Sequence, residues 1–144
     1  MSDKALDKAV EVAKLVNGSK IIIIHVIPEI PTPIFLKEIR SPKTGVVITF
    51  SEYMVSLYQE IEFEMREKLE RKNEKYSKHG LDIEIYITIG SPIDKILEYT
   101  IDKKIDLIVI GSIGVTGISK FFKGLGSVSR NVSEKVSCPI LIVR

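Results

Sequence analysis

The residues best suited to chemistry lie in a glycine- and serine-rich stretch that follows a short apolar run. Because glycine has no Cβ, its backbone N–H group can approach a phosphate closely. The unpaired amides and the positive dipole at a helix N-terminus also favour a bound anion. The sequence therefore predicts an anion cradle made of Gly111, Gly114, Gly117, Gly124 and Gly126 together with the hydroxyls of Ser127 and Ser129.

The same residues also have plainer interpretations. Glycines after a strand are common in tight turns, and Ser127 and Ser129 are favourable helix caps. Lys120 and Lys123, inside the stretch, can either pair with a phosphate or remain solvated charges. The glycine spacing matches neither of the two best-known phosphate-binding fingerprints. Taken alone, the stretch leaves both interpretations open.

The composition of the whole chain argues against several classes of function. A length of 144 residues predicts one domain spanning 1–144, and a formal net charge of +2 is too small to indicate nucleic-acid binding. No apolar run approaches the roughly 18–20 residues that span a membrane. The single cysteine, Cys138, excludes an internal disulfide and is typical of a reducing cytoplasm. No pair of histidines or carboxylates stands at metal-ligand spacing.

Predicted strands and helices alternate along the chain. Alternation of this kind indicates an α/β fold with an open, parallel, doubly wound sheet, Rossmann-like, with helices on both faces in three α/β/α layers. Ligands of such folds bind beyond the carboxyl ends of the strands. The predicted strands are 20–27, 81–89, 106–111 and 138–143, with a short extra strand at 46–48 in the irregular segment 28–49; the predicted helices are 2–16, 51–79, one starting at Ser91-Pro92, and 127–136.

Apolar residues at helical spacing predict which side of each helix is buried. We expect buried stripes of Ala5, Leu6, Ala9, Val10, Ala13 and Val16 in the first helix, of Met54, Tyr58, Ile61, Met65, Leu69 and Tyr76 in the long helix, and of Ile93, Ile96, Leu97 and Ile101 in the third.

Several short motifs, distributed over nearly the whole chain, resemble those of the universal stress protein family. They are HVI after the first strand, IGSP, DLIVIGSIGVTG, GSVSRNV and the final CPILIVR. Nucleotide-binding members carry G-x-x-G, nine residues, then Gly followed by Ser or Thr. Gly111 and Gly114 match the first pair, but Leu125 follows Gly124, and the Gly-Ser pair comes two residues later at Gly126. The loop is therefore two residues longer than the family pattern.

The resemblance implies an adenine nucleotide alpha hydrolase-like fold that binds ATP, with Mg²⁺ alongside the phosphates. It also implies a homodimer formed through the final strand, 138–143. Val26 stands where the family uses a backbone group near adenine, although core packing explains this residue equally well. The implied nucleotide-binding residues are Val26, Ile110, Gly111, Gly114, Lys120, Gly124, Gly126, Ser127, Val128 and Ser129.

Family members usually begin with a strand in the middle of the sheet, and this chain begins about where that strand would end. Unpaired main-chain groups in a buried sheet cost on the order of 1–3 kcal/mol each. We therefore expect strands 20–27 and 106–111 to pair directly, or a segment of another chain to fill the position between them.

Three functions are compatible with these observations. The leading hypothesis is a cytoplasmic stress-response module that binds ATP and acts as a homodimer. A second is a slow ATPase or phosphotransferase, for which Glu29 and Glu38 of the segment 28–49 are the only candidates for positioning water. A third is a dimeric interaction protein that binds no nucleotide.

Overall fold

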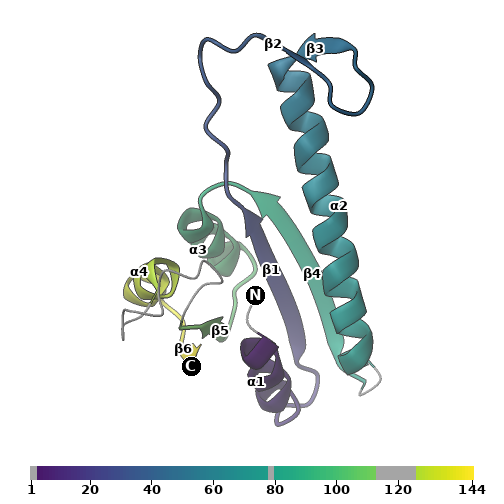
Figure 1. The fold of residues 1–144 in the computed structure, drawn as a ribbon. Helices are drawn as coiled ribbons and strands as arrows, with labels where there is room; N and C mark the ends of the chain where they lie inside the picture. The colour runs from purple at the N-terminus through teal and green to yellow at the C-terminus, as the bar shows by residue number, and fades with distance from the viewer. Residues whose placement is uncertain (1–2, 78–79, 113–125) are drawn as a thin grey trace.

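The fold is an α/β fold in three layers, as the sequence predicts (Figure 1). The computed structural model describes residues 3–77, 80–112 and 126–144. In chain order the elements are α1 (Asp3–Ala13), β1 (Lys20–Ile27), β2 (Glu38–Arg40), β3 (Val47–Thr49), α2 (Phe50–Ser77), β4 (Asp82–Ile89), α3 (Pro92–Asp102), β5 (Ile108–Gly111), α4 (Ser127–Lys135) and β6 (Ile140–Val143).

The strands of the central layer form two separate parallel pairs. β1 pairs with β4 from Lys20 opposite Asp82 to Ile27 opposite Ile89, and β5 pairs with β6 from Ile108 opposite Ile140 to Gly111 opposite Val143. β2 and β3 form a small antiparallel hairpin away from both pairs. α2 packs on β4, α1 packs on β1, β5 and β6, and α3 packs on β1 and α4.

The expectation that strands 20–27 and 106–111 pair directly is wrong. Within the part of the chain that the structure describes, β1 bonds only β4, and β5 bonds only β6. α1 contacts both β1 and β5, so helix packing joins the two pairs where hydrogen bonds were expected. As a result, Ile108, Val109 and Ile110 are only half-buried, although interior parallel strands are normally covered on both faces.

The hydrophobic core lies between the two helices α1 and α2 and the β1–β4 pair. Its buried members are Leu6, Val10, Ala13, Ile21, Ile23, Leu69 and Tyr76, and Ile83, Ile85 and Ile87 pack against them. Three polar contacts join the helices: Lys72 pairs with Asp3, Lys75 pairs with Asp7 at 3.8 Å, and the Tyr76 hydroxyl donates to the Asp7 carboxylate. The helical periodicity of α1 and α2 therefore identified the core members Leu6, Val10, Ala13, Leu69 and Tyr76.

The prediction that Val16 and Ile101 are buried is wrong. Tertiary contacts determine where the first of these helices ends and how the second is turned. α1 ends at Ala13, where the Ser19 hydroxyl donates to the Ala13 carbonyl oxygen at 2.7 Å, and Val16 is 60% exposed in the turn toward β1. In α3 the ring of Tyr99 stacks on Tyr86 of β4, with centroids 4.3 Å apart. That stack turns Tyr99 inward and leaves Ile101 71% exposed.

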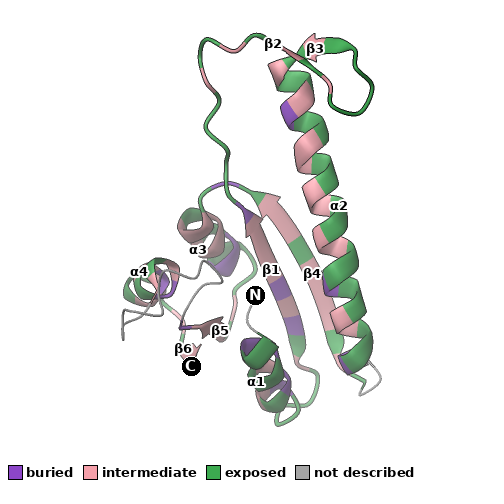
Figure 2. Ribbon diagram, viewed as in Figure 1, coloured by how far each residue is buried: buried purple, intermediate pink, exposed green. Residues whose placement is uncertain are grey.

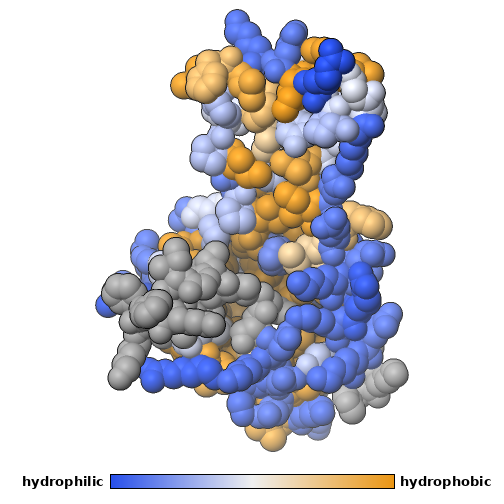
Figure 3. Space-filling model, viewed as in Figure 1, coloured by the Kyte–Doolittle hydropathy of each residue, from blue (hydrophilic) through white to orange (hydrophobic). Residues whose placement is uncertain are grey.

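The N-terminal half of α2 extends past the sheet and carries the hairpin at its end (Figure 1). Its 28 residues make a helix about 42 Å long, whereas the 8 residues of β4 span about 26 Å. Val55 and Phe63 are therefore exposed, as are Ile34 and Phe35 before the hairpin. Figure 2 shows this region as largely exposed, and Figure 3 shows apolar surface over it. None of the helices in the described ranges is long and apolar enough to cross a membrane.

Two substitutions in α2 test this division between a packed half and an exposed half. Leu69 is 2% exposed, so Leu69→Ala leaves a cavity and is expected to lower the free energy of unfolding by about 2–5 kcal/mol. Phe63 is 65% exposed, so Phe63→Ala is expected to change it by less than about 0.5 kcal/mol. Urea unfolding measures both, and equal effects would contradict the assignment of the core.

Candidate functional site

The end of β5 and the start of α4 lie together, as the glycine-rich stretch predicts. The amide of Ser112, the residue after β5, donates to the Val143 carbonyl oxygen of β6 at 2.7 Å. The carbonyl oxygen of Ser112 in turn accepts the Gly126 amide at 2.6 Å. Ser112 is only 5% exposed. The main chain of Ser112 therefore fixes Gly126, the residue before α4, to the carboxyl end of the β5–β6 pair.

The Ser129 hydroxyl strengthens this junction. It lies 3.0 Å from the Gly126 carbonyl oxygen and 3.3 Å from that of Ser112, and it donates its single hydrogen between them. Ser129 is 3% exposed. Ser127 is exposed on the other side of the same turn, and its hydroxyl has no partner among the residues that the structure describes. The two serines thus have different surroundings, and only Ser127 offers a hydroxyl to a ligand without breaking an existing bond.

The first turn of α4 presents unpaired amides. Gly126 is the N-cap residue, with an extended backbone, and no side chain caps the helix. The first intrahelical bond runs from the Arg130 amide to the Gly126 carbonyl oxygen at 3.0 Å. The amides of Ser127, Val128 and Ser129 precede it and therefore lack helical acceptors. Together with the positive end of the helix dipole, these amides favour an anion.

The other predicted site residues fall into two groups. Val26, Ile110 and Gly111 are half-buried near the carboxyl ends of β1 and β5. Val26 is the last residue but one of β1, and Ile110 and Gly111 are the last two residues of β5. Gly114, Gly117, Lys120 and Gly124 lie outside the described residues, as does Lys123. The structure thus positions the two ends of the predicted loop.

The whole chain matches one known family: the model of the universal stress protein family aligns with residues 1–144. The chain belongs to this family. Universal stress protein YxiE of Bacillus subtilis is 35% identical over 144 residues, which is 100% of this chain and 91% of YxiE.

Solved structures of the same family share the fold. That of MJ0577, a universal stress protein of Methanocaldococcus jannaschii, has a TM-score of 0.71 and 25% identity, covering 97% of this chain and 88% of MJ0577. A universal stress protein in complex with cAMP has a TM-score of 0.56 and 24% identity, covering 99% of this chain and 89% of that one. The α/β fold of this universal stress protein is therefore that of its family.

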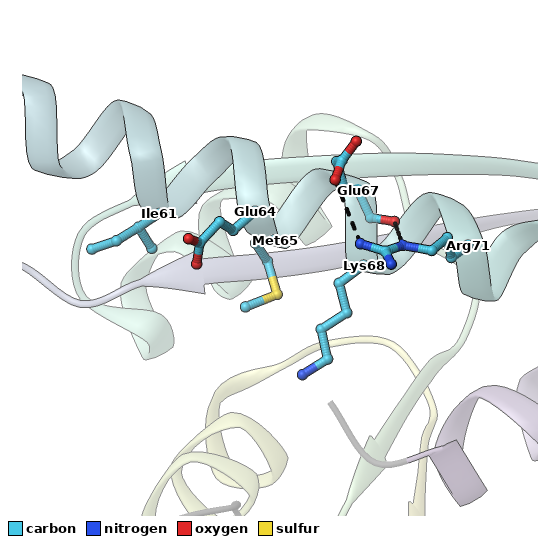
Figure 4. A pocket seen from close by; sticks show the side chains of 6 residues that line it. All are labelled: Ile61, Glu64, Met65, Glu67, Lys68 and Arg71. Atoms are coloured by element: carbon cyan, nitrogen blue, oxygen red, sulfur yellow. Dashed lines mark hydrogen bonds and ion pairs between the residues drawn. The ribbon is translucent and has the colours of Figure 1, made fainter.

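A pocket of about 590 Å³ lies along α2, separate from the α4 junction (Figure 4). Sequence reasoning did not predict it, because the stripe of Ile61 and Met65 indicated only core packing. Met65 and Lys68 extend from one side of the helix, and Arg71 pairs with Glu67 at 3.5 Å. The charges of its lining are balanced, since Glu64, Glu67, Lys68 and Arg71 all contribute. This lining does not indicate one class of ligand.

Metal-binding side chains do not gather in the regions that the structure describes. No group of three or more His, Cys, Asp or Glu residues there could hold a metal ion. The chemistry offered at the α4 junction is that of N–H and O–H donors, which suits a phosphate rather than a bare cation.

The half-buried His25 of β1 is expected to make stability depend on pH. Burial lowers the pKa of His25 below its ordinary value, and the positive charge of Lys68 lowers it further. Protons therefore bind the unfolded chain, with a pKa of about 6.5, more tightly than the folded one. The contribution of neutral His25 to the free energy of unfolding is complete above pH ~6.5 and declines as the pH falls below that value.

We expect urea unfolding between pH 7.5 and 5.5 to show a declining free energy for the natural chain and a flatter profile for His25→Gln. Identical pH profiles for the two proteins would show that His25 does not carry this dependence.

Proposed function

We propose that the chain is a cytoplasmic stress-response module that binds ATP and acts as a homodimer. The phosphates lie at the start of α4, and binding changes the contacts of the dimer rather than driving rapid chemistry. The observation that carries this proposal is the uncapped first turn of α4, which is fixed to the end of β5 through the Ser112 carbonyl oxygen.

The phosphate end of the nucleotide is expected at Ser127 and Val128. Their amides point out of the helix start, and the exposed Ser127 hydroxyl adds a donor that strengthens when its acceptor is charged. Ser129 supports the site indirectly, because its hydroxyl already bonds main-chain oxygens. Mg²⁺, where present, is carried by the phosphates, which supply the oxygen ligands that it prefers.

The base and ribose are expected near Val26 and Gly111, at the carboxyl ends of β1 and β5. Ligands of doubly wound folds bind at this edge. A protein of the same fold has been solved in complex with cAMP, an adenine nucleotide.

An ATPase or phosphotransferase has less support. Glu29 is exposed in the connection after β1, and Glu38 is exposed on β2. The β2–β3 hairpin contacts α2, and in Figure 1 it lies well apart from α4. A catalytic base must stand within hydrogen-bond reach of the proton that it removes.

Ser127 and Ser129 form a matched pair for testing the nucleotide site. Ser127→Ala removes a free hydroxyl, so we expect ATP affinity to fall about tenfold or more at unchanged stability. Ser129→Ala removes a buried bond, so we expect the free energy of unfolding to fall by about 1 kcal/mol. Calorimetric titration with ATP and Mg²⁺, together with urea unfolding, measures both effects. If the natural chain gives no heat and no thermal shift at millimolar nucleotide, it binds none, and the third hypothesis stands.

The dimer is expected to form at the outer edge of β6. Carbonyl oxygens of Pro139 and Val143 accept bonds from the β5 side, so the main-chain groups of Ile140 and Ile142 face away from β5. An apolar edge strand with free main-chain groups is a template for pairing with another chain. A second copy of β6 would satisfy these groups.

Ile142→Pro tests this interface without removing a bond between β5 and β6. Proline has no N–H group, so the outer edge of β6 loses one donor and gains a bulky ring. Sedimentation velocity is expected to show a dimer for the natural chain and a monomer for Ile142→Pro. A natural chain that sediments as a monomer, or a variant that remains a dimer, would place the interface elsewhere.

A further inference from the structure

The β2–β3 hairpin has an outer edge at β2 that no strand in the described ranges covers. The carbonyl oxygen of Lys37, just before β2, and the amide of Ser41, just after it, both bond residues that flank β3. In an antiparallel ladder, residues that bond the partner strand alternate with residues whose main-chain groups point away from it. The amides and carbonyl oxygens of Glu38 and Arg40 therefore face outward, away from β3.

The other edge of the hairpin, at β3, is less open. The Thr49 amide donates to the Glu52 carboxylate at 2.9 Å, and the Thr49 hydroxyl donates to the same carboxylate at 2.8 Å. These bonds cap the start of α2, so this outward-facing donor of β3 is already occupied. β2 is thus the edge of the hairpin that is free to add a strand.

The side chains of β2 suit pairing with a second copy of the same strand. Glu38 and Arg40 are exposed on one face of β2, on either side of the half-buried Ile39. Within the described residues neither charged group forms an ion pair, although Arg40 donates to the Gly45 carbonyl oxygen at 2.7 Å. In an antiparallel pair centred on Ile39, Glu38 of each copy stands opposite Arg40 of the other, and such opposite charges attract. Centring the pair on Glu38 or on Arg40 would place like charges opposite each other.

The same register satisfies the main chain. Directly opposite residues of an antiparallel pair exchange both of their N–H···O bonds at every second position. Glu38 and Arg40, whose groups face outward, would be the bonded positions, and Ile39 would lie on the two-fold axis. A contact of this kind uses the same surface on both copies and closes on itself. Charged residues usually keep a strand edge from pairing, but in this register they favour it.

Apolar side chains beside β2 add area to this contact. A turn just before the strand has Ile34 and Phe35 at its corners, where they are 99% and 88% exposed. Turn corners are usually occupied by glycine, proline or small polar residues. The antiparallel register brings this turn beside the loop between β2 and β3 of the other copy, where Val46 is 59% exposed. Figure 3 shows apolar surface at this end of the molecule.

The size of the contact determines its strength. Burial of Ile34, Phe35 and Val46 would remove roughly 300–500 Å² of apolar surface from water in each copy. A stable interface of standard size buries about 800 Å² per partner. The hairpin contact therefore has enough area for a specific but weak association, which depends on protein concentration.

We propose that the outer edge of β2 pairs antiparallel with β2 of a second copy of this chain, so that two hairpins form one continuous sheet. This contact is separate from the dimer expected at β6, because the hairpin and β6 lie well apart in Figure 1. It requires no nucleotide. Since the contact is weak, it is dissociated at about 10 μM, where β6 alone sets the sedimentation, and it forms near about 1 mM.

Sedimentation equilibrium of the full chain tests the association. We expect the mean mass at about 1 mM to be at least about twice that at about 10 μM, whatever the state of β6. Hydrogen exchange locates the contact. The amides of Glu38 and Arg40 are expected to exchange more slowly as the concentration rises, whereas the Ile39 amide, which faces β3, is expected to remain unchanged.

Two charge reversals test the register. Glu38→Arg leaves two basic residues on β2, and Arg40→Glu leaves two acidic ones, so each variant alone is expected to associate at least about fivefold more weakly. An equimolar mixture of the two variants, and the double variant Glu38→Arg/Arg40→Glu, restore opposite charges and are expected to regain the association. Urea unfolding checks that each variant is folded.

Three outcomes would overturn the proposal. They are a mean mass that does not change with concentration, a rise in mass without slower exchange at Glu38 and Arg40, and single reversals that associate as well as the natural chain or are not rescued by mixing. ATP titration and the Ile142→Pro variant are read separately. Loss of nucleotide binding or of the β6 dimer would therefore leave the hairpin contact standing, and loss of the hairpin contact would leave the proposed function standing.

Discussion

Contact of α1 with both strand pairs is the interaction on which the rest of the structure depends. Hydrogen bonds hold each pair together, but within the described chain none joins β1 to β5. The apolar side of α1 contacts β1 and β5, and Leu6 and Val10 also enter the core beneath α2. Side-chain packing, which is non-directional, therefore holds the two strand pairs together. Between neighbouring strands of a continuous sheet, main-chain hydrogen bonds have this role.

The start of α4 is also held to the rest of the fold by few contacts. One carbonyl oxygen, that of Ser112, accepts the Gly126 amide and lies within reach of the Ser129 hydroxyl. Carbonyl oxygens have two lone pairs and can accept both. This arrangement orients α4 against the end of β5 while using none of the first-turn amides. The donors that suit an anion are left free because the helix is held by other groups.

Sequence reasoning succeeded where local pattern and tertiary contact agree. β1 has the predicted bounds 20–27 because its apolar run needs burial in any sheet, and the stripe that contains Leu69 and Tyr76 follows helical spacing into the core. It failed at Val16 and Ile101, because a bond from Ser19 and a stack of Tyr99 on Tyr86 decide where a helix ends or how it is turned. Periodicity carries no information about either contact. The predicted site residues within the described ranges lie at strand and helix ends, but which serine hydroxyl is free could not be read from the sequence.

The open edges and the predicted site are related by geometry. In a complete sheet, a strand between β1 and β5 would bond the main-chain groups of Val26 and Gly111. In this chain the main-chain groups of both residues face away from β4 and β6, and no strand in the described ranges pairs with them, so the donors and acceptors near the expected base are the ones that strand pairing would use. Local departures from a fully bonded structure are retained in proteins chiefly at functional sites, because elsewhere they only cost stability. The open edge of β5 and the uncapped start of α4, which the hydrogen bond from the Gly126 amide to the Ser112 carbonyl oxygen holds together, follow that rule.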